Sequence, residues 1–273
     1  MSTSTAQREA LRELAVRVAE EAGGLLQGYA DRLGELVVDT KTSATDPVSE
    51  ADREAELLIA RQLAAARPDD GLLAEEDQAS RRGTSGLRWV VDPLDGTVNF
   101  LYGLPAWCVS VAVEDEHGPL AGAVHHPATH ETFHAARGAG ARCGGALLRV
   151  TEVATLGQTL LATGFGYDPD VRADQADDFA GLLREVRDLR RAGAAALDLA
   201  WTAAGRLDAY AEFGLQPWDW AAGRLLVTEA GGVVSEHERV LGGRSMTGVV
   251  AAGAAAHDQL VAWLQAHPRG EHR

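Results

Sequence analysis

Two aspartates spaced three residues apart mark the stretch of this sequence with the clearest chemical potential. Asp92 and Asp95 lie in Asp-Pro-Leu-Asp-Gly-Thr, directly after the apolar, β-branched run 89–91, which predicts a buried strand. Pro93 lacks a backbone N–H, so we expect the strand to end at Asp92, and Gly96 can supply the positive φ of a tight turn. Carboxylates and a hydroxyl on such a bend are oxygen ligands of the kind that Mg²⁺ shares with phosphate groups.

The stretch from Asp92 to Thr97, followed by Asn99 and Phe100, resembles the signature of the inositol monophosphatase family of magnesium-dependent phosphatases. Two aspartates alone are more often part of a surface turn, so distant parts of the chain have to supply the remaining ligands. The resemblance implies an α+β or α/β fold, a layered αβαβα sandwich. It also implies a homodimer, because the family is commonly dimeric.

Composition limits the class of protein. A chain of 273 residues, 46% of them hydrophobic, can bury a large core in one domain or in two packed halves. No apolar run reaches the roughly 18 residues of a membrane span, and the first residues do not resemble a signal peptide. A net charge of −15 argues against nucleic acid as the main ligand. Cys108 and Cys143 lack zinc or disulfide spacing, so we expect a cytoplasmic protein, and the arginine-rich, alanine-rich composition indicates a bacterial one.

The pattern of elements predicts two halves that form one compact unit, an α+β half over 1–150 and an α/β half over 151–273. In the first half we expect two helices, 6–33 and 49–68, then a meander of strands at 108–113, 119–125, 131–137 and 146–150. In the second half we expect strands at 160–165, 207–212, 233–234 and 248–252, with helices at 173–189, 194–204, 217–231 and 255–266.

A second motif precedes the predicted helix 49–68. Lys41, the only lysine, is followed by Asp46, Val48, Ser49 and Asp52, an order that resembles the family's lysine and D-x-V-T-x-x-D. The resemblance implies that Asp52 lies beside the metals and helps to hold a third ion. The alternative is a carboxylate in the first helical turn, where the helix dipole favours it.

A third group of acids follows the apolar pair 72–73. Glu75, Glu76 and Asp77 would ordinarily form a solvated loop, but the family has a metal-ligating glutamate at the position of Glu75. Ala74 stands where the family usually has glycine, and it would strain the chain only if φ there were positive.

The second half carries two more motifs. Residues 190–196 resemble the family's R-x-x-G-(S/T)-A-A segment, which places Gly193, Ala194 and Ala195 on the alcohol side of the pocket. Glu212 matches an acid that accepts hydrogen bonds from substrate hydroxyls, although an ordinary carboxylate at a strand edge would look the same. Residues 218–223 and 229–232 resemble the family's C-terminal signature, and Asp219 is expected at the start of a helix.

The resemblance assigns Mg²⁺ ligands to these positions, for two ions with a third at Asp52. One ion would be held by two carboxylates and a backbone carbonyl, those of Glu75, Asp92 and Leu94. The other would be held by the carboxylates of Asp92, Asp95 and Asp219. A pair of ions can clamp both the attacking and the leaving oxygen.

The remaining roles concern the phosphate and the alcohol. Gly96 and Thr97 would offer backbone N–H groups to the phosphate, and Glu75 with the Thr97 hydroxyl would orient a metal-bound water for in-line attack. Substrate contacts are implied for Asp95, Gly96, Thr97, Gly193, Ala194, Ala195, Glu212 and Asp219. Four histidines, His125, His126, His130 and His134, fit no zinc motif, and we expect them to be structural or on the surface.

These residues predict hydrolysis of a small phosphate monoester, myo-inositol monophosphate, that depends on magnesium and is inhibited by lithium. Fructose bisphosphate, phosphoadenosine phosphate and histidinol phosphate stay open as alternatives. The histidinol type carries an acid at the position of Ala194, which argues against it. A hypothesis of another class is a binding or regulatory protein that uses the phosphatase fold to contact a macromolecule.

Overall fold

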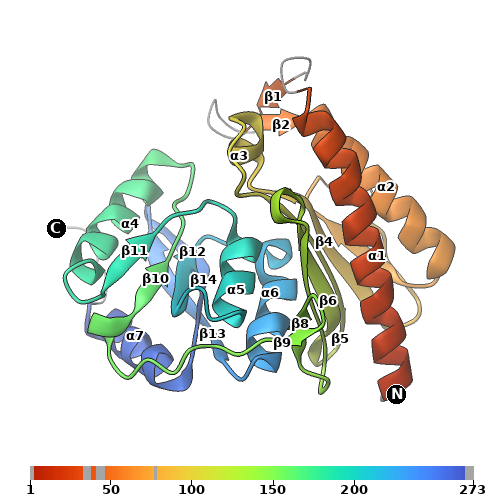
Figure 1. Cartoon of the computed structure of the whole chain (residues 1–273). Helices are drawn as coiled ribbons and strands as arrows, with labels where there is room; N and C mark the ends of the chain where they lie inside the picture. Colours follow the sequence, from red (N-terminus) through yellow and green to blue (C-terminus); the bar gives the residue numbers. More distant parts are fainter. Residues whose placement is uncertain (1–2, 33–37, 41–46, 77–78, 268–273) are drawn as a thin grey trace.

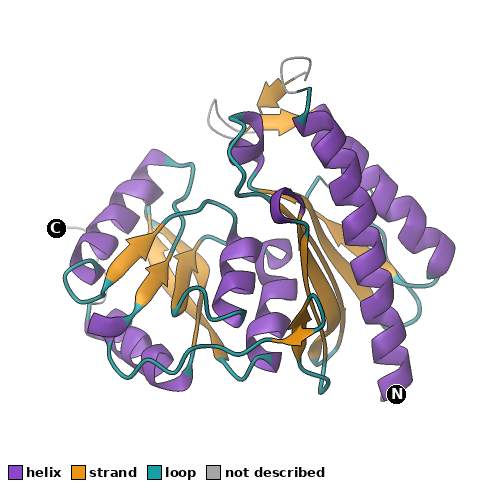
Figure 2. Ribbon diagram, in the orientation of Figure 1, coloured by secondary structure: helices purple, strands orange, loops and turns teal. Residues whose placement is uncertain are grey.

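The computed structural model describes residues 3–32, 38–40, 47–76 and 79–267. Its helices and strands form five layers, helix–sheet–helix–sheet–helix (Figure 1; Figure 2). This arrangement confirms the predicted layered αβαβα sandwich. In the described part of the chain, no helix is long and apolar enough to cross a membrane.

The first sheet has seven strands in the order β3-β4-β5-β6-β7-β8-β9. Only the β3–β4 pair is parallel, and the rest form the predicted antiparallel meander. The strands are β3 (Gly71–Ala74), β4 (Arg88–Asp95), β5 (Cys108–Asp115), β6 (Gly118–His126), β7 (Glu131–Ala136), β8 (Ala141–Cys143) and β9 (Ala146–Leu147). A separate antiparallel pair consists of β1 (Val38–Thr40) and β2 (Pro47–Ser49). Lys41, Asp46 and Asp77 lie outside the described residues.

Two helices, α1 (Thr5–Ala30) and α2 (Glu50–Ala66), cover the outer face of this sheet (Figure 1). Ser4 and Gln7 form a capping box at the start of α1, which satisfies N–H groups that the first turn leaves unpaired. Leu11, Leu14 and Val18 lie on one helical stripe and are buried against the sheet, as the sequence periodicity predicts.

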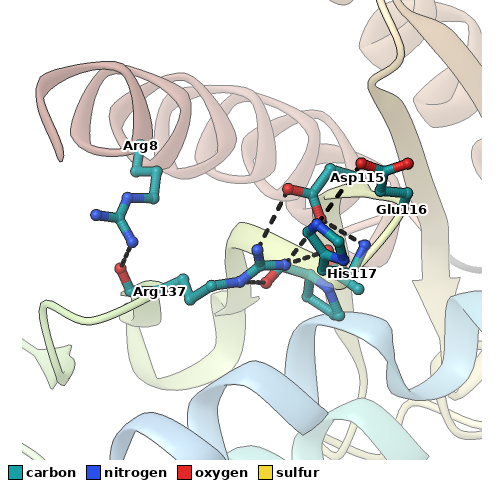
Figure 3. A network of polar contacts seen from close by, with 7 residues as sticks. Arg8, Asp115, Glu116, His117 and Arg137 are labelled. Atoms are coloured by element: carbon teal, nitrogen blue, oxygen red, sulfur yellow. Dashed lines mark hydrogen bonds and ion pairs between the residues drawn. The ribbon is translucent and has the colours of Figure 1, made fainter. Parts of the chain in front are cut away.

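A polar network ties the start of α1 to the sheet (Figure 3). Arg137 donates to both Asp115 carboxylate oxygens, at 3.1 and 3.2 Å, and Arg8 donates to the Arg137 carbonyl. Arg137 also donates to the Pro119 carbonyl at 3.0 Å. The network therefore links the β5–β6 turn to α1.

The second sheet has five strands in the order β11-β10-β12-β14-β13. β11, β10 and β12 are parallel, and β12, β14 and β13 pair antiparallel. The strands are β10 (Leu160–Ala162), β11 (Asp188–Arg190), β12 (Ala209–Phe213), β13 (Val233–Leu241) and β14 (Arg244–Ala252). The helices are α4 (Pro169–Leu182) and α7 (Ala254–Ala266) on the outer face, and α5 (Ala195–Ala203) and α6 (Pro217–Glu229) between the two sheets.

The layer formed by α5 and α6 buries a core shared by both sheets. Phe133 and Val90 of the first sheet belong to the same apolar cluster as Leu197, Tyr210 and Leu226 of the second half. Burial of this kind contributes about 1.5–3 kcal/mol for each large apolar side chain. The two halves are thus packed together, while the boundary at residue 150 stays a prediction.

Several predicted elements are wrong in extent: the strands predicted at 233–234 and 248–252 are the longer β13 and β14, and those predicted at 146–150 and 160–165 are the shorter β9 and β10. Two further differences have a local cause. β4 continues past Pro93 to Asp95; the ladder is interrupted after Asp92 and resumes with Asp95 opposite Cys108. The helix predicted over 173–189 is instead α4, which begins at Pro169 because Asp168 caps it. Residues 188–190 leave the helical pattern because they pair with β10 as a parallel strand.

Candidate active site

Ten predicted site residues line one cavity of about 520 Å³ between the two halves. They come from both sheets and from the helices between them. The ten are Glu75, Asp92, Leu94, Asp95, Gly96, Thr97, Gly193, Ala195, Glu212 and Asp219. Asp52 and Ala194 are buried and are not among the residues that line the cavity.

The bend after Asp92 is built by the residues of the signature. Asp92 Oδ1 accepts the Leu94 N–H at 2.9 Å. Gly96 has φ = 90°, and a Cβ there would lie 2.8 Å from the Ala106 carbonyl oxygen, so only glycine fits. Thr97 begins α3 (Thr97–Leu101), and its hydroxyl donates to the Leu94 carbonyl at 2.9 Å.

Asp95 is held by the first turn of α5. Its Oδ1 accepts the Ala195 N–H at 3.2 Å, and its Oδ2 accepts the Ala196 N–H at 2.7 Å. The Cys108 thiol donates to Oδ2 at 3.6 Å. Asn99 adds a further link, because its Nδ2 donates to the Ala192 carbonyl at 2.8 Å. The signature and the 190–196 segment are therefore joined directly.

Asp219 reaches the cavity from the start of α6. Pro217 occupies the first helical turn, as predicted, and Asp219 Oδ2 accepts the Gln216 N–H at 2.6 Å in a capping box. Glu75 follows β3, and its N–H donates to the Val91 carbonyl at 3.3 Å. Ala74 causes no strain, because His130 is the one described non-glycine residue with positive φ.

The carboxylates perturb one another. Burial raises the pKa of Asp92 well above its usual range, and the charges of Glu75, Asp95, Asp219 and Asp52 raise it further. Asp52 is fully buried in the first turn of α2.

Asp95 differs from Asp92 in how its charge is supported. Burial raises the pKa of Asp95 to about 6, and the Ala196 N–H opposes that rise by bonding to the charged form. Burial also raises the pKa of Asp219 well above its usual range. Clusters of buried carboxyl groups with raised pKa values are typical of functional sites.

The donor set fits Mg²⁺. Buried carboxylates and the Leu94 carbonyl are hard oxygen ligands, and a cation among them would relieve the repulsion that raises their pKa values. In the described residues, no three His, Cys, Asp or Glu side chains already converge as closely as the ligands of one ion do.

Glu212 lies at the end of β12 and lines the same cavity. The Tyr210 hydroxyl donates to its Oε2 at 2.8 Å. Burial raises the pKa of Glu212 to about 7, and the Tyr210 hydrogen bond opposes the rise. A Cβ at Gly164 would lie 2.2 Å from the Glu212 carboxylate, so the missing side chain makes room for this group.

Sequence reasoning missed part of the lining. Arg191, Arg244, Tyr167 and Trp218 also face the cavity. Arg191 lies in the 190–196 segment and Trp218 in the 218–223 motif, so these two motifs could have indicated both residues. Tyr167 and Arg244 come from a loop and from the start of β14, where no residue pattern marked them.

Two of the four histidines, His125 and His126, form hydrogen bonds within the first half of the chain and have a structural role. His125 shares a hydrogen bond with Thr132 at 3.0 Å, and His126 with the Pro105 carbonyl at 2.8 Å. Burial lowers the pKa of both.

Residues 7–269 match the model of the inositol monophosphatase family. Inositol-1-monophosphatase SuhB of Mycobacterium tuberculosis is 41% identical over 93% of this chain and 93% of its own. A protein named Nus factor SuhB from Escherichia coli is 39% identical over 88% and 90%. The crystal structure of the extragenic suppressor protein SuhB from Bartonella henselae superimposes with a TM-score of 0.85 at 37% identity, over 94% of this chain and 98% of that one. The chain therefore belongs to the inositol monophosphatase family.

Proposed function

We propose that this chain is a magnesium-dependent phosphatase that hydrolyses myo-inositol monophosphate to inositol and phosphate. The observation that carries the proposal is the cavity itself. Four carboxylates from three separate segments, those of Glu75, of Asp92 and Asp95, and of Asp219, line it together with Glu212.

Mg²⁺ would be held by Glu75, Asp92 and the Leu94 carbonyl, and by Asp92, Asp95 and Asp219, with Asp52 beside them for a third ion. When bound, it supplies positive charge that neutralises the phosphate and makes a water more acidic.

Glu75 and Thr97 would then orient the attacking water. The Thr97 hydroxyl already donates to the Leu94 carbonyl, so its oxygen is left to accept a hydrogen bond from the water. Glu75 can accept the proton that the water loses. The backbone N–H groups of Gly96 and Thr97 would bind phosphate oxygens.

The alcohol would lie between Glu212 and residues 193–195. Glu212 keeps an oxygen for substrate hydroxyls beside the one that Tyr210 occupies. Ala194 packs beneath Gly96, 3.2 Å from the position of a Cβ there, so its contribution would be to shape the wall rather than to touch the substrate.

Phosphate release from four substrates tests the proposal: inositol 1-phosphate, fructose 1,6-bisphosphate, phosphoadenosine phosphate and histidinol phosphate, each with Mg²⁺ and with chelator. We expect inositol 1-phosphate to give the highest kcat/KM and chelator to abolish turnover. Higher kcat/KM with another ester would transfer the assignment to that substrate. Full activity in chelator would refute the metal site.

A second candidate function comes from the names of relatives. Proteins named Nus factor SuhB from Escherichia coli and Pseudomonas aeruginosa are 39% and 40% identical to this chain, so a binding role beside catalysis is the alternative. The test uses a strain that lacks this protein. If the Asp92→Asn variant restores growth of that strain, the cellular role does not require hydrolysis.

Homodimer formation stays a prediction, and sedimentation analysis would test it.

A further inference from the structure

A buried tyrosine two residues before Glu212 carries a polar group that its apolar surroundings do not require. Tyr210 is fully buried in β12 and belongs to the same apolar cluster as Leu197 of α5 and Leu226 of α6. It is not among the residues that line the cavity. Its hydroxyl donates to Glu212 Oε2 at 2.8 Å. Because a phenylalanine would fill nearly the same space without burying a hydroxyl, the contribution specific to tyrosine here is the hydrogen bond to Glu212.

The second sheet fixes the place of this hydroxyl. β12 is paired on both sides, with Tyr210 opposite Ala162 of β10 and Ala251 of β14. Tyr210 and Glu212 are two residues apart on one strand, so their side chains leave the same face of the sheet. This is the face that α5 and α6 cover (Figure 1). The donor to Glu212 is therefore held by paired strands and not by a loop.

The Glu212 carboxylate is confined on a second side by Gly164, which follows β10. A Cβ at Gly164 would lie 2.2 Å from Oε2 and 2.3 Å from Oε1, so the carboxylate lies against this bare stretch of backbone. Among the described residues, Tyr210 is the one that donates a hydrogen bond to Glu212. Oε1 thus keeps both of its acceptor positions for a ligand. One donor and one glycine order a flexible side chain that would otherwise lose conformational entropy on binding the alcohol.

The Tyr210 hydroxyl remains a donor near neutral pH. Burial raises the pKa of Tyr210 well above its usual value, and the charges of Glu212 and Asp198 raise it further. Burial also raises the pKa of Glu212 to about 7, and the hydrogen bond from Tyr210 opposes that rise. Of the other charged groups around Glu212, Asp95 raises its pKa and Arg191 lowers it. The tyrosine therefore supports the charged form of the carboxylate as well as its orientation.

We propose that Tyr210 is a positioning residue that holds the Glu212 carboxylate in place for the hydroxyls of the alcohol. The inference rests on the proposed function, because it requires that Glu212 contacts an alcohol. Tyr210 lies outside the cavity lining and affects the alcohol through Glu212. Two consequences distinguish this role from a structural one. The preference for a polyol phosphate over bare phosphate depends on the Tyr210 hydroxyl, and this dependence requires the carboxylate at position 212.

A double-mutant cycle on Tyr210 and Glu212 tests this. The proteins are wild type, Tyr210→Phe, Glu212→Gln and the double variant, each loaded with Mg²⁺. Calorimetry gives Kd for a non-hydrolysable phosphonate analogue of inositol 1-phosphate and for inorganic phosphate, and the ratio of the two Kd values measures the preference for the alcohol. We expect Tyr210→Phe to lower this preference about three- to tenfold, the range for the loss of one hydrogen bond. The same change should have a much smaller effect in a protein that already carries Glu212→Gln.

A matched control and a pH series complete the test. The Tyr29 hydroxyl also forms a hydrogen bond with a glutamate, Glu54, but Tyr29 lies on α1 and outside the cavity lining, so Tyr29→Phe should retain the preference. In wild type the preference should increase as the pH rises through about 7, where Glu212 becomes charged. In Tyr210→Phe this increase should move to higher pH, because the hydrogen bond that supports the charge is missing. The two probes titrate identically with either protein, so the shift belongs to the protein.

The outcomes separate the inference from the proposed function. A preference that survives Tyr210→Phe overturns the role of Tyr210, as does an equal loss in Tyr29→Phe or a full effect in the Glu212→Gln protein. Equal weakening of both probes by Tyr210→Phe would mean general damage to the cavity, which also overturns it. In each of these cases hydrolysis of inositol 1-phosphate by wild type still supports the proposed function.

Two outcomes bear on the proposed function as well. If the preference behaves as stated but wild type hydrolyses no ester, the proposed function fails and the Tyr210 assignment stands. If wild type shows no preference for the inositol analogue over phosphate, Glu212 does not contact the alcohol, and the inference falls together with the inositol assignment.

Discussion

Glu212→Gln separates the effect of this carboxylate on substrate binding from its effect on folding. Gln has nearly the same volume and can still accept the Tyr210 hydrogen bond (2.8 Å in the wild type), but it carries no charge. Because burial raises the pKa of Glu212 to about 7, the wild-type group is mostly charged near pH 8.5 and mostly neutral near pH 5.5, about 1.5 pH units on either side.

The effect on folding follows from linkage. The ordinary pKa is 4.5 and the folded value is about 7, so the folded state binds this proton more tightly than the unfolded chain. The contribution of this bound proton to the free energy of unfolding is fully present below about pH 4.5, and it is lost as the pH rises through about 7. The difference corresponds to about 3 kcal/mol, and water in the cavity reduces it to about 1–2 kcal/mol.

Urea unfolding in chelator measures this effect. Glu212→Gln should raise the unfolding free energy by about 1–2 kcal/mol near pH 8.5, because it removes a buried charge, and should change it little near pH 4.5. A variant less stable than wild type near pH 8.5 would contradict the reasoning.

Kinetics gives the second half of the test. Hydrogen bonds to a charged group are worth about 1.5–3 kcal/mol, so kcat/KM for inositol 1-phosphate should fall about ten- to a hundredfold near pH 8.5. The loss should shrink near pH 5.5, where the wild-type carboxyl is already neutral. The generic substrate p-nitrophenyl phosphate has no hydroxyls to bind and should be hydrolysed as before. Equal losses on both substrates would show that Glu212 does not contact the alcohol.

Three further predictions concern the same cavity. Asp92→Asn should abolish turnover while the melting temperature in chelator holds or rises, because one of several clustered carboxylates is removed; calorimetry showing a large loss of stability would instead make Asp92 a turn residue. Lithium at millimolar concentration should inhibit turnover if the family resemblance extends to its metal sites, and an inhibition curve that stays flat would count against that. Gly164→Ala should displace Glu212, since its Cβ would lie 2.2 Å from the carboxylate, and raise KM for inositol 1-phosphate but not for p-nitrophenyl phosphate; unchanged KM values would mean that Glu212 does not hold the alcohol.

Several helices could be predicted from the sequence because they depend on local patterns, whereas the layered sandwich and ten residues of the cavity lining followed from the family resemblance. The apolar stripe of α1 and the Pro217 start of α6 are visible without tertiary context. The end of β4 at Asp95 could not be predicted from such local patterns. Pro93 removes one donor, but Asp92 takes over the Leu94 N–H with its side chain, and the strand resumes at Asp95.

Features that depend on pairing between distant segments could not be predicted from the sequence. Leu189 fits the apolar stripe of a helix, yet it forms part of β11 because Leu161 lies beside it. Arg190 and Arg191 are a second example of what sequence patterns alone do not distinguish. The family pattern marks Arg190, whereas the cavity contains Arg191, and only the contacts of Asp188 and Gly193 distinguish the two.

Asp92 and Asp95 differ in how the second half of the chain supports their charges. Both carboxylates are buried, but Asp95 accepts two N–H groups from the first turn of α5, which support its negative charge. The side-chain hydrogen bond of Asp92 comes from its own bend, at Leu94, and burial together with the charges of the neighbouring carboxylates raises the pKa of Asp92 well above its usual range. The second half therefore does more than cover the cavity: the first turn of α5 supports the charged form of Asp95 through two N–H groups, whereas the hydrogen bond that Asp92 accepts comes from Leu94 in the first half.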